Sequence, residues 1–371
     1  MPATRTPAGA ASWGRKGPLV LVLVTGGAGF IGSHVVDLLL SEGYGVRVLD
    51  NLSEAAHSGK PTYLNPGAEY VWGDVSAPDV CAAAVSGVDS VCHQAARVGL
   101  GVDFGDAVGY VADNDLGTAT LLKALFASSF RGPVVLASSM VVYGEGGYSC
   151  PTHGRVRPAP RREEHLRAGR FEPPCPQCGA PLEPTEIDES EPVDPRSIYA
   201  ATKLHQEHLC QTFSREVGCP VVSLRYHNVY GPRMPRDTPY AGVASIFRSL
   251  LEAGRPPRVF EDGMQRRDFI HVSDIARANL AALQAGPSAS GCYNIATGVV
   301  RTIADMAHAL AAAFGPGAPS PVTTGEYRLG DVRHITASPE AAARCLGFRH
   351  RIAFEEGMAD FATAELRAPL G

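Results

Sequence analysis

The sequence predicts an α/β fold: a doubly wound parallel sheet of the Rossmann type, a smaller α/β domain after it, and a Cys-rich inserted segment. Three observations lead to this prediction. An apolar strand, a glycine-rich turn and an amphipathic helix follow one another between residues 19 and 43. Strand and helix patterns then alternate as far as Leu224. Between residues 145 and 190 this alternation breaks into a stretch rich in Pro, Arg, Gly and Cys.

The glycine-rich turn joins the first predicted strand to the first helix. Gly26 permits the tight turn, Gly29 lets the backbone approach a pyrophosphate, and Gly32 lets the helix pack close to the sheet. Phe30 and Ile31 open the helix, where free backbone N–H groups attract phosphate charge. The strand–turn–helix setting favours a dinucleotide-binding turn over an ordinary glycine turn.

The end of the second strand bears on the choice of dinucleotide. Val46–Leu49 leads into Asp50 and Asn51, roughly 20 residues after the glycines. A carboxylate at this position accepts hydrogen bonds from the ribose hydroxyls and repels a 2′-phosphate, so NAD is favoured over NADP. Arg47 lies nearby and argues in the other direction.

Further strands and helices follow in alternation. We predict strands at 70–72, 88–94, 133–138 and 221–224, and helices at about 106–128 and 197–217. Right-handed crossovers bring the carboxyl ends of these strands to one edge, where a cofactor must lie.

The rhythm loosens from Tyr226 onward. Short strands are expected near Val259, Ile270 and Tyr293, and helices at about 239–253, 273–285, 302–314, 338–345 and 354–367. We therefore divide the chain into a disordered tail (1–17), a cofactor domain (18–226, with the insertion at 145–190) and a substrate domain (227–371).

A pair of side chains on the second long helix has the spacing of an acid–base site. Tyr199 and Lys203 are four residues apart and so share one helix face. A phenol titrates near pH ~10, and an adjacent ammonium and the positive ring of NAD⁺ would lower its pKa. Tyr199 could then take a proton from a substrate hydroxyl, while Ser139 holds the same oxygen from a strand end. The alternative is a surface Tyr and a solvated Lys.

Four motifs occur in order along the chain: Thr25–Gly32, Ser138–Gly144, the Tyr199/Lys203 pair and Arg225–Arg233. Together they resemble the extended short-chain dehydrogenase/reductase family, and within it the nucleotide-sugar epimerases. The resemblance covers about residues 19–143 and 188–350. It implies an NAD cofactor, a nucleotide-sugar substrate, and a homodimer formed through the helices at 106–128 and 197–217.

The resemblance also implies roles for single residues. Around the cofactor, besides Tyr199 and Lys203, it places Asp74 and Val75 at the adenine, Ala95 and Ala96 at the pyrophosphate, Asn114 beside the cofactor and Tyr226 near the nicotinamide. Around the substrate it places Ser139, Met140, Asn228, Val259, Arg267, Arg328 and Asp331. The two arginines would clasp the diphosphate, although either one alone would be interpreted as a solvated surface charge.

The residues after Ser139 help to choose the reaction. By resemblance, sugar 4,6-dehydratases carry an Asp-Glu pair there, whereas this chain has Met140 and Val141, which cannot move a proton. We therefore predict an NAD-dependent epimerase that inverts C4 of a dTDP- or UDP-hexose, such as dTDP-L-rhamnose, through a 4-keto intermediate. Two alternatives stay open: an NAD(P)H-dependent NDP-4-ketosugar reductase and a non-catalytic dinucleotide-binding regulator.

The inserted segment contains two turns of the form Cys-Pro-x-ligand-Gly. They supply Cys150 with His153 and Cys175 with Cys178, a Cys₃His set with the spacing of structural zinc sites. The alternatives are a disulfide or unconnected loop side chains. Since the segment has little apolar content, bound metal would order it. We expect a zinc-bound lid or rim beside the active site, or a dimer contact, with positive charge from Arg155, Arg157, Arg161 and Arg162.

Charge and composition argue against several other classes. The formal net charge of −5 disfavours a nucleic-acid binder. No apolar run approaches the roughly 18 residues of a membrane span, and residues 1–17 lack the apolar core of a secretory signal. Nine cysteines in 371 residues do not indicate the disulfide framework of a small secreted domain. We therefore expect a cytoplasmic enzyme.

Overall fold

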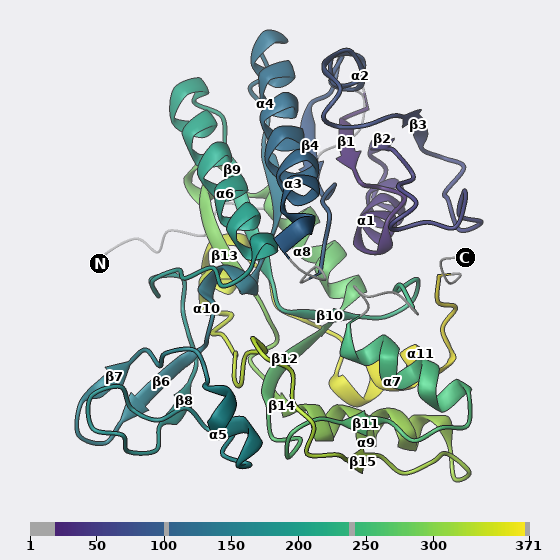
Figure 1. The fold of residues 1–371 in the computed structure, drawn as a ribbon. Coiled ribbons are helices and arrows are strands. Elements are labelled where there is room, and N and C mark those ends of the chain that lie inside the picture. Colours follow the sequence, from purple (N-terminus) through teal and green to yellow (C-terminus); the bar gives the residue numbers. More distant parts are fainter. Residues whose placement is uncertain (1–18, 100–103, 237–241, 368–371) are drawn as a thin grey trace, which may run out of the picture.

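The computed structural model describes residues 19–99, 104–236 and 242–367. The predicted tail (1–17) and the first residues of the helix predicted at 239–253 lie outside these ranges. Figure 1 shows a large sheet with its helices in the upper part, a smaller domain at lower right and a separate lobe at lower left. Among the described residues, no helix combines the length and the apolar character needed to cross a membrane.

A seven-stranded sheet confirms the predicted fold class. Its strand order is β3-β2-β1-β4-β5-β9-β13, and every pair is parallel. The order reverses between β1 and β4, the place where doubly wound sheets leave a crevice for a ligand. The strands are β1 Leu21–Thr25, β2 Gly45–Asp50, β3 Glu69–Trp72, β4 Ser90–His93, β5 Val134–Ser139, β9 Val221–Tyr226 and β13 Gly291–Ile295.

Helices cover both faces of this sheet. One face buries its apolar side chains against α1 (Phe30–Ser41), α8 (Val272–Gln284) and α10 (Glu340–Leu346). The other face is covered by α2 (Pro78–Ala84), α4 (Gly117–Ala127) and α6 (Ile198–Val217). The chain enters α4 through a continuous helical segment made of η1 (Phe104–Asp106), α3 (Ala107–Tyr110) and the π-helical η2 (Val111–Leu116).

The seventh strand corrects the predicted domain boundary. We expected the strand near Tyr293 to belong to the substrate domain (227–371), but β13 pairs with β9 in the large sheet, from Gly291 to Ile295. The reason is that α8 packs on the same sheet face as α1 and returns the chain to the sheet edge. The alternation was obscured because the chain first leaves the sheet to form β10 (Asn228–Tyr230) and β12 (Arg266–His271).

The smaller domain follows β9 directly. It contains the sheet β10-β12-β14 and the pair β11-β15, and α7 and α11 pack on α9. Phe247, Phe269, Met306 and Phe361 lie in its buried core. Its elements are β10 Asn228–Tyr230, α7 Val243–Glu252, β11 Arg258–Val259, β12 Arg266–His271, β14 Val300–Thr302, α9 Ile303–Phe314, β15 Val322–Thr323 and α11 Phe354–Thr363.

The insertion folds as a small unit, which we call the insertion module (residues 145–190). Its antiparallel sheet has the order β7-β6-β8, and a short helix α5 follows β7. Its buried apolar cluster is small and includes two cysteines: Tyr148, Cys150, Cys175 and Leu182. The elements are β6 Gly147–Cys150, β7 Gly154–Val156, α5 Glu163–Arg167 and β8 Glu183–Thr185, at lower left in Figure 1.

A buried ion pair joins α6 to the middle of the large sheet. The carboxylate of Glu207 accepts hydrogen bonds from Ser138 Oγ at 2.5 Å and from Arg225 Nε and Nη2 at 2.9 and 2.8 Å. The side chains of Glu207 and Arg225 are 1% and 7% exposed. The pair therefore fixes the register of α6 against the strand ends at Ser138 and Arg225.

Replacing Glu207 by Gln should destabilise the fold by about 3 kcal/mol, because the buried Arg225 guanidinium loses its counter-charge. Urea unfolding measures the change in the free energy of unfolding. Glu216→Gln, at the exposed end of the same helix, is the matched control and should shift it by no more than about 0.5 kcal/mol. Equal unfolding midpoints for Glu207→Gln and the wild type would contradict this account.

Candidate active site

A cavity opens at the carboxyl edge of the large sheet, beyond the ends of the neighbouring strands β1 and β4. With one exception, the residues predicted to bind the cofactor line this cavity. They are Gly26, Gly29, Phe30, Ile31, Gly32, Asp50, Asn51, Asp74, Val75, Ala95, Ala96, Tyr199, Lys203 and Tyr226.

The exception is Asn114, which is fully buried behind the cavity wall. Its side chain accepts a hydrogen bond from Arg97 N at 2.7 Å and donates to Arg97 O at 3.1 Å and to Thr202 Oγ1 at 2.9 Å. These bonds tie the loop after β4 to α6. Asn114 also lies in the π-helical turn η2, a local widening that often accompanies functional sites.

The glycine turn is packed too tightly for any other residue at two positions. Gly26 adopts the left-handed φ of +67°, and a Cβ atom there would lie 2.7 Å from Ala95 N. A Cβ atom at Gly32 would lie 2.1 Å from the carbonyl oxygen of Gly26. The backbone surface above this turn is therefore free of side chains where α1 begins, as a pyrophosphate site requires.

The carboxylate of Asp50 is held at the end of β2 by the turn itself. It accepts hydrogen bonds from Ala28 N at 3.0 Å and Leu52 N at 2.9 Å. The guanidinium of Arg47 is engaged elsewhere: Nη1 donates to Ala84 O and Ser86 O, and Nε lies 2.9 Å from Glu69. Arg47 is thus engaged away from the cavity, while Asp50 lines it together with Arg367, whose charge interacts with that of Asp50.

Tyr199 and Lys203 line the α6 side of the cavity, and Ser139, which is not part of the lining, contacts Tyr199 from the end of β5. The Tyr199 hydroxyl shares a hydrogen bond with the Ser139 side chain. Lys203 Nζ lies 6.0 Å from the Tyr199 ring centroid and donates to Ala137 O at 2.8 Å. The structure brings a phenol, a hydroxyl and an ammonium together, and their roles in catalysis stay predictions.

The ionisation of this group differs from our expectation. Burial raises the pKa of Tyr199 to about 12, and the hydrogen bond with Ser139 offsets only part of that rise. Burial also lowers the pKa of Lys203 to about 8. The chain by itself therefore does not lower the pKa of Tyr199, because burial outweighs the interaction with Ser139, and an added positive charge would have to lower it.

Tyr226 is fixed by a closed ring of three polar side chains. Its hydroxyl donates to Gln94 Oε1 at 3.2 Å and accepts from Asn279 Nδ2 at 2.7 Å, while Gln94 Nε2 donates to Asn279 Oδ1 at 2.9 Å. Gln94 also lines the cavity. The ring therefore ties β9 to the end of β4 and to α8.

Sequence reasoning missed several residues of the cavity lining, among them His57, Gln94, Arg97, Asp113 and Arg367. Gln94 follows the last residue of β4, just before Ala95, and could have been found from that position. Arg97 and Asp113 form an ion pair of 2.7 Å whose partners lie on separate segments. Arg367 approaches from the far end of the chain, so no local pattern indicates it.

The residues predicted to bind substrate lie beside β10 and β12. Asn228 Nδ2 donates to Asp268 O at 3.1 Å and lies 3.5 Å from Met140 Sδ. The guanidinium of Arg267 is held by Arg333 O at 2.9 Å and Val332 O at 2.6 Å. These contacts bring segments from the strand ends and from the smaller domain together.

The remaining predicted substrate residues occupy different environments. Arg328 lies over the Phe260 ring, 5.8 Å from its centroid. Burial raises the pKa of Asp331, with Arg328 and Arg267 acting against that rise. The Val259 side chain is 1% exposed and packs in the core of the smaller domain. Substrate contact by any of these residues stays a prediction.

The four predicted metal ligands meet at one point in the insertion module. The ligand atoms of Cys150, His153, Cys175 and Cys178 all lie within 4.8 Å of one another. His153 Nδ1 is 3.6 Å from the sulfurs of Cys150 and Cys175, and the sulfurs of Cys150 and Cys178 are 3.7 Å apart. The fold therefore brings together side chains that the sequence separates by more than twenty residues.

Residues 22–173 and 175–296 match the NAD dependent epimerase/dehydratase family, so the chain belongs to that family. A similar relative is a dTDP-L-rhamnose 4-epimerase of Burkholderia thailandensis, 33% identical over 347 residues, which are 92% of this chain and 94% of the relative. Among solved structures, a UDP-glucose 4-epimerase of Thermotoga maritima with UDP-glucose is 30% identical, with a TM-score of 0.75 and coverage of 92% and 97%. One of Thermus thermophilus, complexed with NAD, is 31% identical with a TM-score of 0.73 and the same coverage.

The protein is therefore an NAD-dependent enzyme of this family. The described residues fit that cofactor: the glycine turn leaves an unobstructed backbone surface at a helix start, and Asp50 supplies a carboxylate at the end of β2. Ala95 and Ala96 line the cavity beside the turn. These side chains are small enough to leave room for a pyrophosphate.

Proposed function

We propose that the protein inverts C4 of the hexose in a nucleotide sugar through a transient 4-keto intermediate. The observation that carries this proposal is the meeting of Ser139, Tyr199 and Lys203 at the cavity, followed by Met140 and Val141. The first three residues can move one proton at an alcohol carbon. The next two offer no second acid or base, so dehydration lacks its proton carriers.

The residues of this chain would move one proton at the 4-hydroxyl and hold the substrate by its diphosphate. Ser139 would hold the 4-hydroxyl oxygen while Tyr199 removes its proton, and Lys203 would supply nearby positive charge. Bound NAD would supply the acceptor and donor of hydride at C4. Arg267 and Arg328 would hold the diphosphate bidentately, so that the sugar can turn about that anchor and be protonated again by Tyr199.

A dTDP-linked 6-deoxyhexose such as dTDP-L-rhamnose is our first choice of substrate, because the relative of that name covers nearly the whole chain. UDP-hexoses are the second choice, supported by the likeness to the UDP-glucose 4-epimerase structures. An NDP-4-ketosugar reductase would use the same three residues, but Asp50 disfavours an exchangeable NADPH. A regulator that only senses dinucleotide would need no proton acceptor at Tyr199.

The purified enzyme, incubated with dTDP-L-rhamnose, UDP-glucose and UDP-galactose, should convert at least one of them to its C4 epimer without added cofactor, and should release NAD on denaturation. Chromatography of the sugars checks this. Tyr199→Phe should lower turnover by at least about 10²-fold while NAD stays bound, since only the proton acceptor is lost.

Tyr44→Phe, at the far end of α1, is the matched control and should keep wild-type turnover. Near-normal activity of Tyr199→Phe would refute the mechanism. Release of no cofactor, together with NADPH-dependent reduction of a 4-keto sugar, would favour the reductase instead.

We further propose that Cys150, His153, Cys175 and Cys178 bind a structural zinc ion. A tetrahedral zinc with Zn–S of about 2.3 Å and Zn–N of about 2.0 Å separates its ligands by about 3.8 Å for S···S and about 3.6 Å for S···N. Three of the six ligand separations, at 3.7 and 3.6 Å, lie close to those edges, and all six are within 4.8 Å. A disulfide would need sulfurs about 2.05 Å apart. Four protein ligands leave no open position, which favours a structural over a catalytic ion.

Elemental analysis of the purified protein should find one zinc per chain, and Cys178→Ser should reduce that content severalfold because one thiolate ligand is lost. Cys345→Ser is the matched control, since Cys345 is also an exposed cysteine but has no place in the cluster. Full removal of zinc by a chelator should disorder the module and lower turnover. A chain that contains no zinc as purified, or whose fold and turnover ignore its removal, would contradict the proposal.

We propose that two copies associate through the helical layer formed by α3, η2, α4 and α6, with α4 and α6 side by side (Figure 1). Large apolar side chains stand exposed along it: Phe104 at 79%, Val108 at 80% and Leu116 at 53%. Their spacing places them on one side of the helical segment, where a second copy could bury them.

The location in the cytoplasm also stays a prediction.

Val108→Asp should convert dimers to monomers in light scattering after gel filtration, because a carboxylate would be buried at the interface without a partner. Val322→Asp, on the exposed strand β15, is the matched control and should leave the mass unchanged. A wild-type protein that is monomeric at micromolar concentration would refute the dimer.

A further inference from the structure

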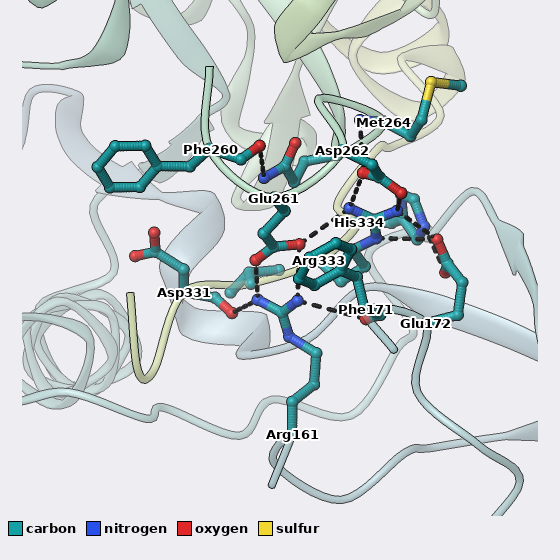
Figure 2. A network of polar contacts seen from close by, with 12 residues as sticks. Arg161, Phe171, Glu172, Phe260, Glu261, Asp262, Met264, Asp331, Arg333 and His334 are labelled. Atoms are coloured by element: carbon teal, nitrogen blue, oxygen red, sulfur yellow. Dashed lines mark hydrogen bonds and ion pairs between the residues drawn. The ribbon is translucent and has the colours of Figure 1, made fainter. Parts of the chain in front are cut away.

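The insertion module meets the smaller domain through a group of five charged side chains, three of them buried, which we call the Arg161–Arg333 cluster. The module supplies Arg161 and Glu172, and the smaller domain and the chain after it supply Glu261, Asp262 and Arg333 (Figure 2). The side chains of Arg161, Glu261 and Arg333 are 5%, 1% and 1% exposed. Charges buried this deeply are found where they hold two parts of a fold in one arrangement.

Arg161 grips two segments of the smaller domain at once. Its two terminal nitrogens lie 2.8 and 2.9 Å from the carboxylate oxygens of Glu261, in a bidentate pair. One of them also donates to Asp331 O at 2.7 Å. Arg161 therefore joins the loop after β11 to the loop that begins at Asp331.

Arg333 completes the cluster from the other side. It donates to Glu172 Oε1 at 2.8 and 2.6 Å, to both carboxylate oxygens of Asp262 at 2.7 and 2.8 Å, and to Glu261 Oε2 at 2.9 Å. His334 Nε2 lies 2.9 Å from Glu172 Oε2. Burial opposes ionisation of Glu172, but hydrogen bonds from His334 and Arg333 outweigh it and lower the pKa of Glu172 to about 2.

Glu261 gives independent evidence that the cluster constrains the backbone. Its φ is +54°, a left-handed conformation that residues other than glycine seldom adopt. Its side chain is buried between the two guanidiniums of Arg161 and Arg333 (Figure 2). A strained conformation of this kind persists only when the surroundings fix it. The loop after β11 is thus held in its shape by a residue of the insertion.

The two ends of the module bind the other loop that Arg161 contacts, the segment 331–336 of the smaller domain. Glu145 Oε1 accepts hydrogen bonds from Arg333 N at 2.8 Å and His334 N at 3.3 Å, and Gly146 N donates to His334 O at 3.0 Å. At the other end, Ile187 N donates to Thr336 O at 3.0 Å. The segment 331–336 is therefore fastened to the module along its whole length.

This segment in turn holds Arg267, one of the two arginines proposed to grip the diphosphate. The guanidinium of Arg267 donates to the carbonyls of Val332 and Arg333, whose neighbours Asp331 and His334 are both bound by the module. The second arginine, Arg328, lies over Phe260, the residue before Glu261. Both arginines thus rest on backbone that the cluster fixes.

We propose that the insertion module is a positioning element for the nucleoside diphosphate of the substrate: Arg161 and Glu172 hold the loops that orient Arg267 and Arg328. The proposal rests on the proposed function, from which the role of these two arginines is taken. Arg161 and Glu172 contact other residues of the chain and act through them. Both lie between His153 and Cys175 in sequence, so a metal bound by the cluster of four ligands would also close the loop that carries them.

The test compares Arg161→Met and Glu172→Gln with Arg162→Met in the full-length enzyme. Arg162 is the next residue along the chain, but its side chain is 76% exposed. Calorimetric titration with UDP and dTDP measures the dissociation constant of the nucleotide that the wild type binds, and steady-state kinetics separate KM from kcat. Arg161→Met and Glu172→Gln should raise the dissociation constant and KM about tenfold, with kcat within about twofold and NAD content unchanged. Arg161→Lys should keep part of the wild-type affinity for the nucleotide, and the control Arg162→Met should keep all of it.

Three results would overturn the inference: wild-type affinity in a folded Arg161→Met variant, an equal loss of affinity in Arg162→Met, or a fall in kcat with KM unchanged. If Arg161→Met fails to fold by circular dichroism, Glu172→Gln decides alone, since its side chain is 46% exposed and its loss disturbs the core less. An enzyme that binds a nucleoside diphosphate but epimerises no sugar would refute the proposed function, while the binding constants of the variants would still judge this inference.

Discussion

The close packing of α1 on its own glycine turn is the constraint on which the rest of the cavity depends. Gly32 and the carbonyl of Gly26 are so near that a methyl group cannot come between them, and a methyl group at Gly26 would likewise clash with Ala95. The ends of β1 and β4 are thereby fixed relative to the start of α1. The position of that backbone decides where a dinucleotide can lie, and so where a reacting carbon must be presented.

A chain of buried hydrogen bonds carries this constraint to α6, the helix that holds Tyr199. Thr25 Oγ1 lies 2.7 Å from His93 Nδ1, His93 Nε2 lies 2.9 Å from Thr118 Oγ1, and Gln206 Nε2 donates to Thr118 Oγ1 at 2.6 Å. Burial, together with the charge of Lys203, lowers the pKa of His93 to about 3, so the chain of contacts is neutral at physiological pH. Since Gln206 and Tyr199 share α6, the glycine turn and the phenol are parts of one rigid unit.

The sequence indicates those parts of the site that local spacing determines. The glycine turn, the strand-end residues Asp50 and Ser139 and the pair Tyr199 and Lys203 are each set by a strand end or by one helix face, and the cysteine turns by a repeated pentapeptide. The pairing of Arg161 with Glu261 could not be found this way, because the partners are 100 residues apart and each is an ordinary charged residue in its own segment. The same holds for β13, whose place in the large sheet depends on the packing of α8. The raised pKa of Tyr199 also needed the structure, since the sequence does not show how deeply the phenol is buried.

The two halves of the site are stabilised by different physics, and this difference suits the proposed reaction. The cofactor half rests on apolar packing and close backbone contact, whereas the joint between the insertion module and the smaller domain rests on buried ion pairs. Ion pairs of this kind add little net stability compared with apolar residues, but a wrong arrangement would leave a charge buried without a partner. These ion pairs therefore restrict the joint to one geometry more than they add to the stability of the fold. A sugar that must turn between two faces of a cofactor needs its nucleotide end held in one geometry while its reacting end stays free, and a joint that specifies position is what the diphosphate end of such a site requires.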